Sequence, residues 1–197
     1  MGEREDEAAE GDHAVALFRE GEMVAIEPTE REARKAAWLA ERRTCITATD
    51  VAKILGFSKF GGPIDVYLDK IGELPELDQS AAPLAWGRRM EPIILQAYHE
   101  ECAPLLIEPP YTLRRSVVEP LIGATLDACR VRPLERFDSI FTNSNDLDGR
   151  PGDAKNVRHQ TAEWGDDGTD RIPLYYATQL VVQMFVVAAA RADLAQH

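Results

Sequence analysis

Apolar residues recur at intervals of three and four through much of the chain, and shorter apolar runs occupy part of its second half. Because residues three and four apart share one face of a helix, whereas residues two apart share one face of a strand, the two patterns predict different elements. Helices are predicted over 29–43, 49–55, 63–72, 83–101 and from 173 onward. Strands are predicted over 111–118, 121–131 and 153–157. Helices, then strands, then a helix is an order typical of an α+β or mixed α/β fold.

Three of the predicted helices carry an apolar stripe that we expect to face the core. The stripe of the helix over 63–72 consists of Ile64, Leu68 and Ile71. The stripe of the helix over 83–101 consists of Met90, Ile94, Ala97 and Tyr98. The stripe of the last helix consists of Tyr176, Leu180, Met184 and Val187. Each of these helices is therefore expected to be half buried.

Length and composition predict one globular domain. The chain has 197 residues, of which 45% are hydrophobic, which is enough for one substantial core and too few for two ordinary domains. Its first residues are acidic, rich in small side chains and without periodicity. We therefore predict an acidic, flexible segment over 1–28 and a single folded domain over 29–197.

The chain has no feature of a secreted or membrane protein. No apolar run approaches the roughly 20 residues that a membrane helix needs, and the acidic N-terminus lacks the pattern of a signal peptide. The three cysteines, Cys45, Cys102 and Cys129, are odd in number and lack the spacing of metal ligands. We expect a cytoplasmic protein that makes no contact with membranes.

The formal net charge of −12 is unusual for a protein that binds nucleic acid, because such proteins commonly present a basic surface. The acidic residues are concentrated at the N-terminus, and residues 1–30 alone carry a net charge of −8. The rest of the chain is only mildly acidic. Such a domain can still bind phosphate if its basic groups cluster or if its carboxylates recruit a divalent cation.

Four residues form the most informative constellation: Glu91, Asp127, Asp153 and Lys155. Glu91 lies in a predicted helix and Asp127 near the end of a predicted strand. Asp153 and Lys155 are two residues apart on the next strand, so their side chains share one face. An acid and an amine that face another aspartate suit a hard divalent cation, which keeps positions for a phosphate oxygen and a water. The lysine can hold that water and offset negative charge that develops on a phosphoryl group.

Six short segments match one protein family in order. They are Arg42 with 46–56, 63–72, the Trp-Gly-x-x-x-Glu-Pro motif at 86–92, 124–127, the Asp-Ala-Lys motif at 153–155, and 176–183. Together they resemble the lambda-exonuclease-like, YqaJ-type viral recombinase nucleases of the PD-(D/E)xK superfamily. The resemblance implies a restriction-endonuclease-like core, in which a small central mixed sheet is flanked by helices. The C-terminal strands of that core are expected to be missing from this chain.

The resemblance also implies roles for individual residues. The residues implied to bind a metal ion are Glu91, Asp127, Asp153 and, through its carbonyl, Ala154. The residues implied in catalysis are Lys155, Glu91 and Gln179. Arg42 and Thr49 would line a pocket for a terminal 5′ phosphate, the arginine through charge-assisted hydrogen bonds and the threonine through its hydroxyl.

The implied activity is hydrolysis of phosphodiester bonds in linear duplex DNA, from a 5′ end, as part of a phage-type recombination system. The implied cofactor is Mg²⁺, with Mn²⁺ as the alternative. The implied partners are DNA and a single-strand annealing protein, and the protein itself is expected as a homo-oligomer because relatives form rings around DNA.

Two other interpretations stay open. The residues before Asp153 are poor strand formers, and the family favours glutamate at that position, which fits a catalytically decayed or truncated module that binds DNA or a protein without cleavage. A helical interaction protein would explain the acidic segment but not the ordered motifs. Single residues also have ordinary explanations: Glu91 could pair with a neighbouring arginine, and Gln179 and Gln183 could lie on a helix surface.

Overall fold

Five helices form in the described part of the chain, and all five were predicted. The computed structural model describes residues 16–19, 22–25, 28–75, 82–102, 105–108, 110–131, 147–157, 162–166 and 169–196. The helices are α1 (Pro28–Arg43), α2 (Ala48–Ile54), α3 (Pro63–Ile71), α4 (Ala82–Glu101) and α5 (Leu174–Val187). Each begins within one residue of its predicted start. Helix α3 illustrates the reason, because Pro63 favours its first turn and Gly72, with a φ of 77°, ends it in the left-handed region.

Nine short strands are assigned among the described residues. They are β1 (Ala16–Arg19), β2 (Glu22–Ala25), β3 (Ile46–Thr47), β4 (Leu105–Ile107), β5 (Arg114–Arg115), β6 (Ile122–Ala124), β7 (Ala128–Val131), β8 (Leu147–Lys155) and β9 (Asp193–Gln196). The predicted strand over 111–118 is reduced to β5, and the one over 121–131 is divided into β6 and β7. Between those two, Asp127 directs its carboxylate to the backbone of β8. These elements confirm the mixed α/β fold class.

The largest sheet has the strand order β4-β7-β8-β9. Strand β7 is antiparallel to both β4 and β8, whereas β9 is parallel to β8. Strand β8 begins at Leu147, earlier than predicted, and it includes Pro151 and two glycines. It forms in spite of these poor strand residues because β7 and β9 pair with it on both sides. Strand β9 also follows the last helix, where no further strand was predicted.

Two smaller sheets complete the described strands. Strand β3 pairs in parallel with β6, which pairs antiparallel with β5. Strands β1 and β2 form an antiparallel pair within the acidic segment, where the pattern predicted no element. The flexibility of that segment and the single-domain organisation of 29–197 stay predictions. None of the helices in the described ranges is both long and apolar enough to cross a membrane.

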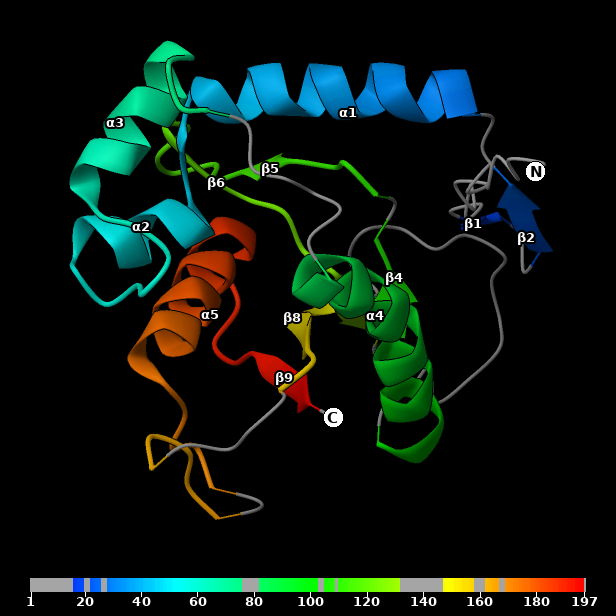
Figure 1. Ribbon diagram of the computed structural model, residues 1–197. Coiled ribbons are helices and arrows are strands. Elements are labelled where there is room, and N and C mark those ends of the chain that lie inside the picture. The colour runs from blue at the N-terminus through cyan, green and yellow to red at the C-terminus, as the bar shows by residue number, and fades with distance from the viewer. Residues whose placement is uncertain are drawn as a thin grey trace, which may run out of the picture.

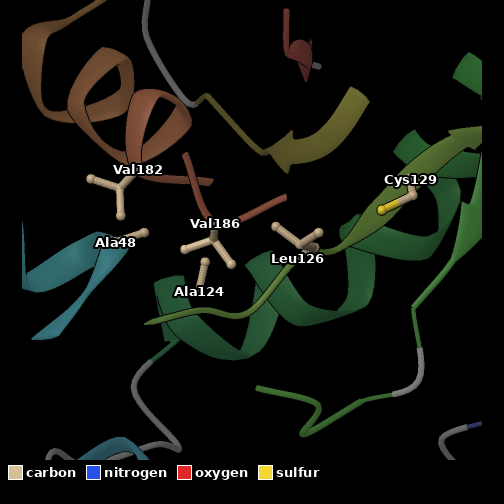
Figure 2. Packing of buried hydrophobic residues seen from close by; sticks show 6 residues of the cluster. All are labelled: Ala48, Ala124, Leu126, Cys129, Val182 and Val186. Atoms are coloured by element: carbon tan, nitrogen blue, oxygen red, sulfur yellow. The ribbon is translucent and has the colours of Figure 1, made fainter. Parts of the chain in front are cut away.

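Helices α4 and α5 lie on either side of β8 and β9 (Figure 1). Toward α4, the alanines Ala128, Ala154 and Ala195 pack with Ile94 and Leu95. Toward α5, a second cluster joins α2, the β6–β7 region and α5 (Figure 2). Its buried members are Ala48, Ala124, Leu126, Cys129, Val182 and Val186. Because neighbouring strand residues point to opposite faces, the packing of Ala154 toward α4 directs the residues on either side of it toward α5.

The buried faces of the helices are partly different from those predicted. In α3, Val66 is buried, whereas Ile64 is 70% exposed and Ile71 is 46% exposed. The reason is that α3 packs against α1 and α2, and this docking leaves the predicted stripe at the surface. In α4, Ile94 is buried as predicted but Ala97 is exposed. The buried residues of α5 are Leu180, Val182, Gln183 and Val186.

Candidate active site

Asp153 is the buried centre of the candidate site. It lies on β8, is 2% exposed and forms an ion pair with Lys155 on the same face of the strand. Two glutamines of α5 donate to its Oδ1 atom, Gln179 through Nε2 at 2.8 Å and Gln183 through Nε2 at 3.0 Å. These glutamines lie four residues apart, so they share one helix face. A carboxylate out of contact with water is thus held by three side chains.

Asp127 approaches the same strand from the end of the β6–β7 segment. Its Oδ2 atom accepts a hydrogen bond of 2.9 Å from the backbone N–H of Ala154, the residue between Asp153 and Lys155. Burial, together with the negative charges of Asp153 and Glu91, raises the pKa of Asp127 to about 8. Near neutral pH this carboxyl group is therefore largely protonated, because burial and the charges of Asp153 and Glu91 outweigh the effects of Lys155 and of the Ala154 backbone N–H.

Glu91 joins this electrostatic cluster from α4. Burial raises the pKa of Glu91, and the charge of Asp153 raises it further, whereas the charges of Lys155 and Arg88 lower it. The interaction with Arg88 is the ordinary explanation that the sequence left open. It operates alongside the interactions with the residues of β8, so Glu91 belongs to the same cluster as Asp153 and Lys155.

Lys155 is the positive charge of the cluster. Burial alone would lower the pKa of its ammonium group, but Asp153, Asp127 and Glu91 more than offset this effect, so the pKa lies above its usual value. Its Nζ atom also contacts the carbonyl oxygen of Ala154 at 3.4 Å. The lysine is therefore charged at neutral pH and able to donate hydrogen bonds, whereas a free amine would be needed for it to act as a base.

The donor set fits a hard divalent cation by its chemistry. Three carboxylates and one ammonium group leave two negative charges when all are ionised, and carboxylate and carbonyl oxygens are the ligands that Mg²⁺ prefers. Among the described residues, however, no group of three or more acidic, histidine or cysteine side chains is already arranged to hold a metal ion. Asp153 instead directs its oxygens to Lys155 and the glutamines. Metal binding would require these side chains to exchange partners.

Arg42 and Thr49, the predicted phosphate-binding residues, lie together at the junction of α1 and α2. The Nη2 atom of Arg42 donates to the hydroxyl groups of Thr47 at 3.4 Å and Thr49 at 3.3 Å. The guanidinium carbon of Arg42 lies 4.5 Å from the ring centroid of Trp38. One guanidinium and two hydroxyl groups are donors that suit a phosphate oxygen.

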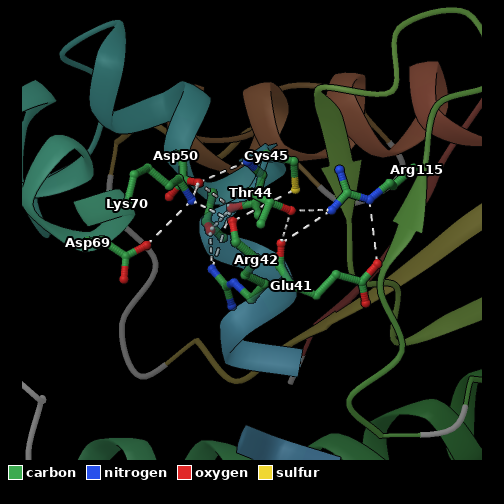
Figure 3. Close-up of polar contacts among 10 residues, drawn as sticks. Glu41, Arg42, Thr44, Cys45, Asp50, Asp69, Lys70 and Arg115 are labelled. Atoms are coloured by element: carbon green, nitrogen blue, oxygen red, sulfur yellow. Dashed lines mark hydrogen bonds and ion pairs between the residues drawn. The ribbon is translucent and has the colours of Figure 1, made fainter. Parts of the chain in front are cut away.

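A buried ion pair fixes the turn that carries these residues (Figure 3). Asp50 accepts hydrogen bonds from the backbone N–H of Thr47 at 2.9 Å and from its hydroxyl at 2.7 Å, and Lys70 of α3 lies 2.6 Å from the same Oδ2 atom. The Nζ atom of Lys70 also donates to the carbonyl of Arg42 at 3.0 Å. Burial would raise the pKa of Asp50, but the hydrogen bonds from Lys70 and Thr47 outweigh it and lower the pKa.

Contacts between side chains connect the two groups of predicted residues. Trp38, which stacks on Arg42, donates from Nε1 to the hydroxyl of Thr125 at 3.0 Å. The backbone carbonyl of Thr125 accepts from Nε2 of Gln183 at 3.4 Å, and the same Nε2 atom contacts Asp153. The arginine and the acidic cluster thus belong to one continuous network.

Sequence reasoning missed three residues of this network. Gln183 has no exposed surface, so the interpretation as a helix-surface residue is wrong for it. Its four-residue spacing from Gln179 was visible, but it indicates a shared face and not burial. Trp38 and Thr125 are far apart in the sequence, and no local signal predicted their hydrogen bond.

A small mixed sheet that holds an Asp-Ala-Lys strand between two helices defines a nuclease-like core, and the comparisons with known proteins agree. The chain belongs to the YqaJ-like viral recombinase domain family, whose model matches residues 37–191. Members of this family are generally nucleases. The chain is also 33% identical over 61 residues to the uncharacterized protein YqaJ of Bacillus subtilis (strain 168). That match covers 31% of this chain and 19% of the Bacillus protein.

Proposed function

We propose that the protein is a metal-dependent exonuclease that degrades linear duplex DNA from a 5′ end. The observation that carries this proposal is the cluster of Glu91, Asp127 and Asp153 around the charged Lys155, in which Asp153 is buried and the other three side chains are half-buried. An excess of buried negative charge costs folding energy, so it is more easily explained by a function than by stability. Membership in a family of viral recombinases supports a substrate of DNA.

Mg²⁺, or Mn²⁺ in its place, would be held by the carboxylates of Glu91, Asp127 and Asp153 and by the carbonyl of Ala154. When bound, such a cation polarises a phosphoryl oxygen and favours ionisation of a coordinated water. Lys155 would then orient the attacking water and stabilise negative charge on the phosphoryl group. Gln179 would keep Asp153 in place through its hydrogen bond of 2.8 Å.

Arg42 and Thr49 would bind the 5′ phosphate at the end of the DNA strand. Their donors already lie within 3.3 Å of each other, so little reorganisation is needed to form the pocket. The network through Trp38 and Thr125 would keep this pocket at a fixed position relative to the acidic cluster. The distance between the pocket and the acidic cluster would then determine which phosphodiester bond of the strand lies at the catalytic residues.

Incubation with linear duplex DNA that carries a 5′ phosphate tests the proposal. We expect degradation in Mg²⁺, none in EDTA, and slower degradation when the end carries a 5′ hydroxyl. Ca²⁺ provides a control in which oxygen ligands are occupied without support for phosphoryl chemistry. DNA that stays intact in both Mg²⁺ and Mn²⁺ would contradict the proposal.

A second candidate function is supported by the lack of a ready-made group of three metal-holding side chains in the described residues. A module of this kind would bind DNA without cutting it, as expected of a decayed nuclease. The same experiment separates the two functions. A binding module would reduce the mobility of the DNA on a native gel with either metal ion and would leave the length of the DNA unchanged. An accompanying annealing protein and a homo-oligomer stay predictions that size-exclusion chromatography can test.

A further inference from the structure

Four aromatic side chains lie in a row beside the candidate active site. Phe60 comes from the segment between α2 and α3, Tyr175 and Tyr176 from the first turn of α5, and Trp164 from the segment before it. The ring centroids are 6.1 Å apart for Phe60 and Tyr175, 4.0 Å for Tyr175 and Tyr176, and 5.7 Å for Tyr176 and Trp164. We refer to these four residues as the aromatic row.

A lysine lies at two positions along the aromatic row. The Nζ atom of Lys59 is 5.2 Å from the ring centroid of Phe60 and 5.5 Å from that of Tyr175. The Nζ atom of Lys155 is 5.6 Å from the ring centroid of Tyr176. The row therefore begins near a surface lysine and reaches the lysine that the proposed function places in catalysis.

The exposure of the row differs from what a packing role requires. Phe60 is 69% exposed, although full burial of a phenylalanine stabilises a protein by roughly 1.5–3 kcal/mol. Lys59 is also exposed, whereas the rings of Tyr175, Tyr176 and Trp164 are half-buried. An open ring at one end and supported rings at the other form a surface on which flat groups can stack.

We propose that the aromatic row binds the unpaired bases of a DNA strand next to the active site. This inference rests on the proposed function for its choice of DNA, since aromatic faces with nearby cations also bind other flat groups. Stacking of bases on aromatic rings combined with lysines along the backbone is how single strands are bound without sequence preference. The positive charge of Lys59, which lies over the rings of Phe60 and Tyr175, suits the phosphates of such a strand at the exposed end of the row.

The direction of the row gives it a role in the reaction. Asp153 is only 2% exposed, and the aromatic row leads from the exposed ring of Phe60 to Lys155, which forms the ion pair with Asp153. A strand separated from its partner can reach Lys155 with its bases against Tyr176 and Tyr175. Bases freed further along would then stack on Phe60.

Binding of a single-stranded oligothymidylate of about 12 nucleotides, a length within the range bound by single-strand sites, tests the inference. Fluorescence anisotropy with a labelled oligonucleotide in EDTA measures affinity without cleavage. We expect Phe60→Ala to weaken binding by roughly 5-fold or more, the effect of losing one stacked base. Phe57→Ala is the matched control, because Phe57 is 44% exposed on the same segment and is not a member of the ring pairs that define the row.

Two further variants separate stacking from apolar contact and from the attraction between Lys59 and phosphates. Phe60→Leu keeps an apolar surface without an aromatic face, so it should weaken binding nearly as much as alanine, and Lys59→Ala should weaken it less at high salt than at low salt. Equal affinity of the wild type and Phe60→Ala for the oligonucleotide would overturn the inference. So would full binding by Phe60→Leu, which would indicate an apolar partner such as a protein.

The outcome for the aromatic row is distinguishable from the outcome for the nuclease. If the wild type degrades duplex DNA and Phe60→Ala has no effect on oligonucleotide binding, the inference about the aromatic row is overturned. The proposed function is then supported. Loss of binding in Phe60→Ala without any degradation by the wild type supports the row and overturns the nuclease. Because Phe60 is mostly exposed, its replacement should change the melting temperature little.

Discussion

Two sites in this protein each pair a lysine with a buried carboxylate, and they differ in how far the carboxylate charge is compensated. At the junction of α1, α2 and α3, Lys70 lies 2.6 Å from the buried Asp50 and 3.4 Å from the more exposed Asp69, and the pKa of Asp50 is lowered. At β8, three carboxylates share Lys155, and the pKa of Asp127 rises to about 8. The first arrangement stabilises the ionised groups, whereas the second lacks positive charge.

This difference separates a structural ion pair from a candidate reactive site. A paired and hydrogen-bonded carboxylate such as Asp50 has its charge compensated within the fold. The cluster at β8 has more carboxylates than Lys155 can compensate, even with Arg88 acting on Glu91, so a proton on one of its acids or an added cation would complete the compensation. Burial is common to both sites, so burial alone does not indicate function. The degree to which the charge of the buried carboxylates is compensated does, and it is shown by a lowered pKa at Asp50 and a raised pKa at Asp127.

The largest expected effect is on activity, from Lys155→Ala. Removal of the ammonium group takes away the donor that we expect to stabilise the phosphoryl group, and the rate of duplex degradation should fall at least about 100-fold. Lys35→Ala, which removes a positive charge on α1, serves as the matched control. Quantification of nucleotides released over time measures both. A Lys155→Ala rate close to that of the wild type would remove the lysine from the mechanism.

The next effect is on stability, from Asp50→Asn. This variant removes the closest and most buried partner of Lys70 and leaves the more exposed Asp69 at 3.4 Å, and breaking a buried pair typically costs about 3–5 kcal/mol. We expect the free energy of unfolding, measured with urea at neutral pH, to fall by about that amount. Because the pKa of Asp50 is lowered in the folded state, the wild type should itself lose this contribution as the pH falls through that pKa. A change below about 0.5 kcal/mol would contradict a structural role.

Asp127→Asn should increase stability, in contrast to Asp50→Asn, and the size of the increase should depend on pH. The pKa of Asp127 is about 8 when folded and near 3.8 when unfolded, so the folded state binds the additional proton. The wild type therefore loses stability as the pH rises from about 4 to about 8, whereas the asparagine variant does not. Urea unfolding across this range should show that the free energy of unfolding of the variant rises relative to that of the wild type as the pH increases. A constant difference would indicate that Asp127 is ionised throughout.

Added Mg²⁺ should reverse part of the loss of stability that the wild type shows as the pH rises. A carboxyl group must release its proton to bind the cation, so Mg²⁺ should raise the melting temperature of the wild type more near pH 8 than near pH 6. The Asp127→Asn variant should show a smaller increase at the higher pH. Differential scanning calorimetry measures both, and an equal shift for the two proteins would argue against Asp127 as a ligand.

The smallest expected effect is from Gln183→Leu. The substitution removes the hydrogen bond of 3.0 Å to Asp153, but it also removes a buried Oε1 atom that has no partner among the described residues. We therefore expect a net loss of stability of only about 1 kcal/mol. The loss of activity, expressed as a free energy, should exceed this loss of stability. The reason is that Asp153 is then positioned by Gln179 and Lys155 alone. Activity equal to that of the wild type would limit Gln183 to packing.

The sequence by itself determined the five helices and the list of candidate residues. Helix boundaries were readable because their signals are local: Pro63 and Gly72 act on the backbone of their own turns. The shared face of Asp153 and Lys155 followed from the alternation of side chains along a strand. The motifs of the family likewise consist of short segments, so they could be recognised without knowledge of the fold.

Only the tertiary structure decided which residues meet and which are buried. Helix α3 exposes Ile64 and buries Val66 because α1 and α2 cover one side of it. Strand β8 extends through Pro151 because its neighbours supply the pairing that its own residues disfavour. The pKa of Asp127 depends on charges brought from α4 and from β8. Each of these outcomes is set by contacts between segments distant in the chain, and periodicity within one segment contains no information about them.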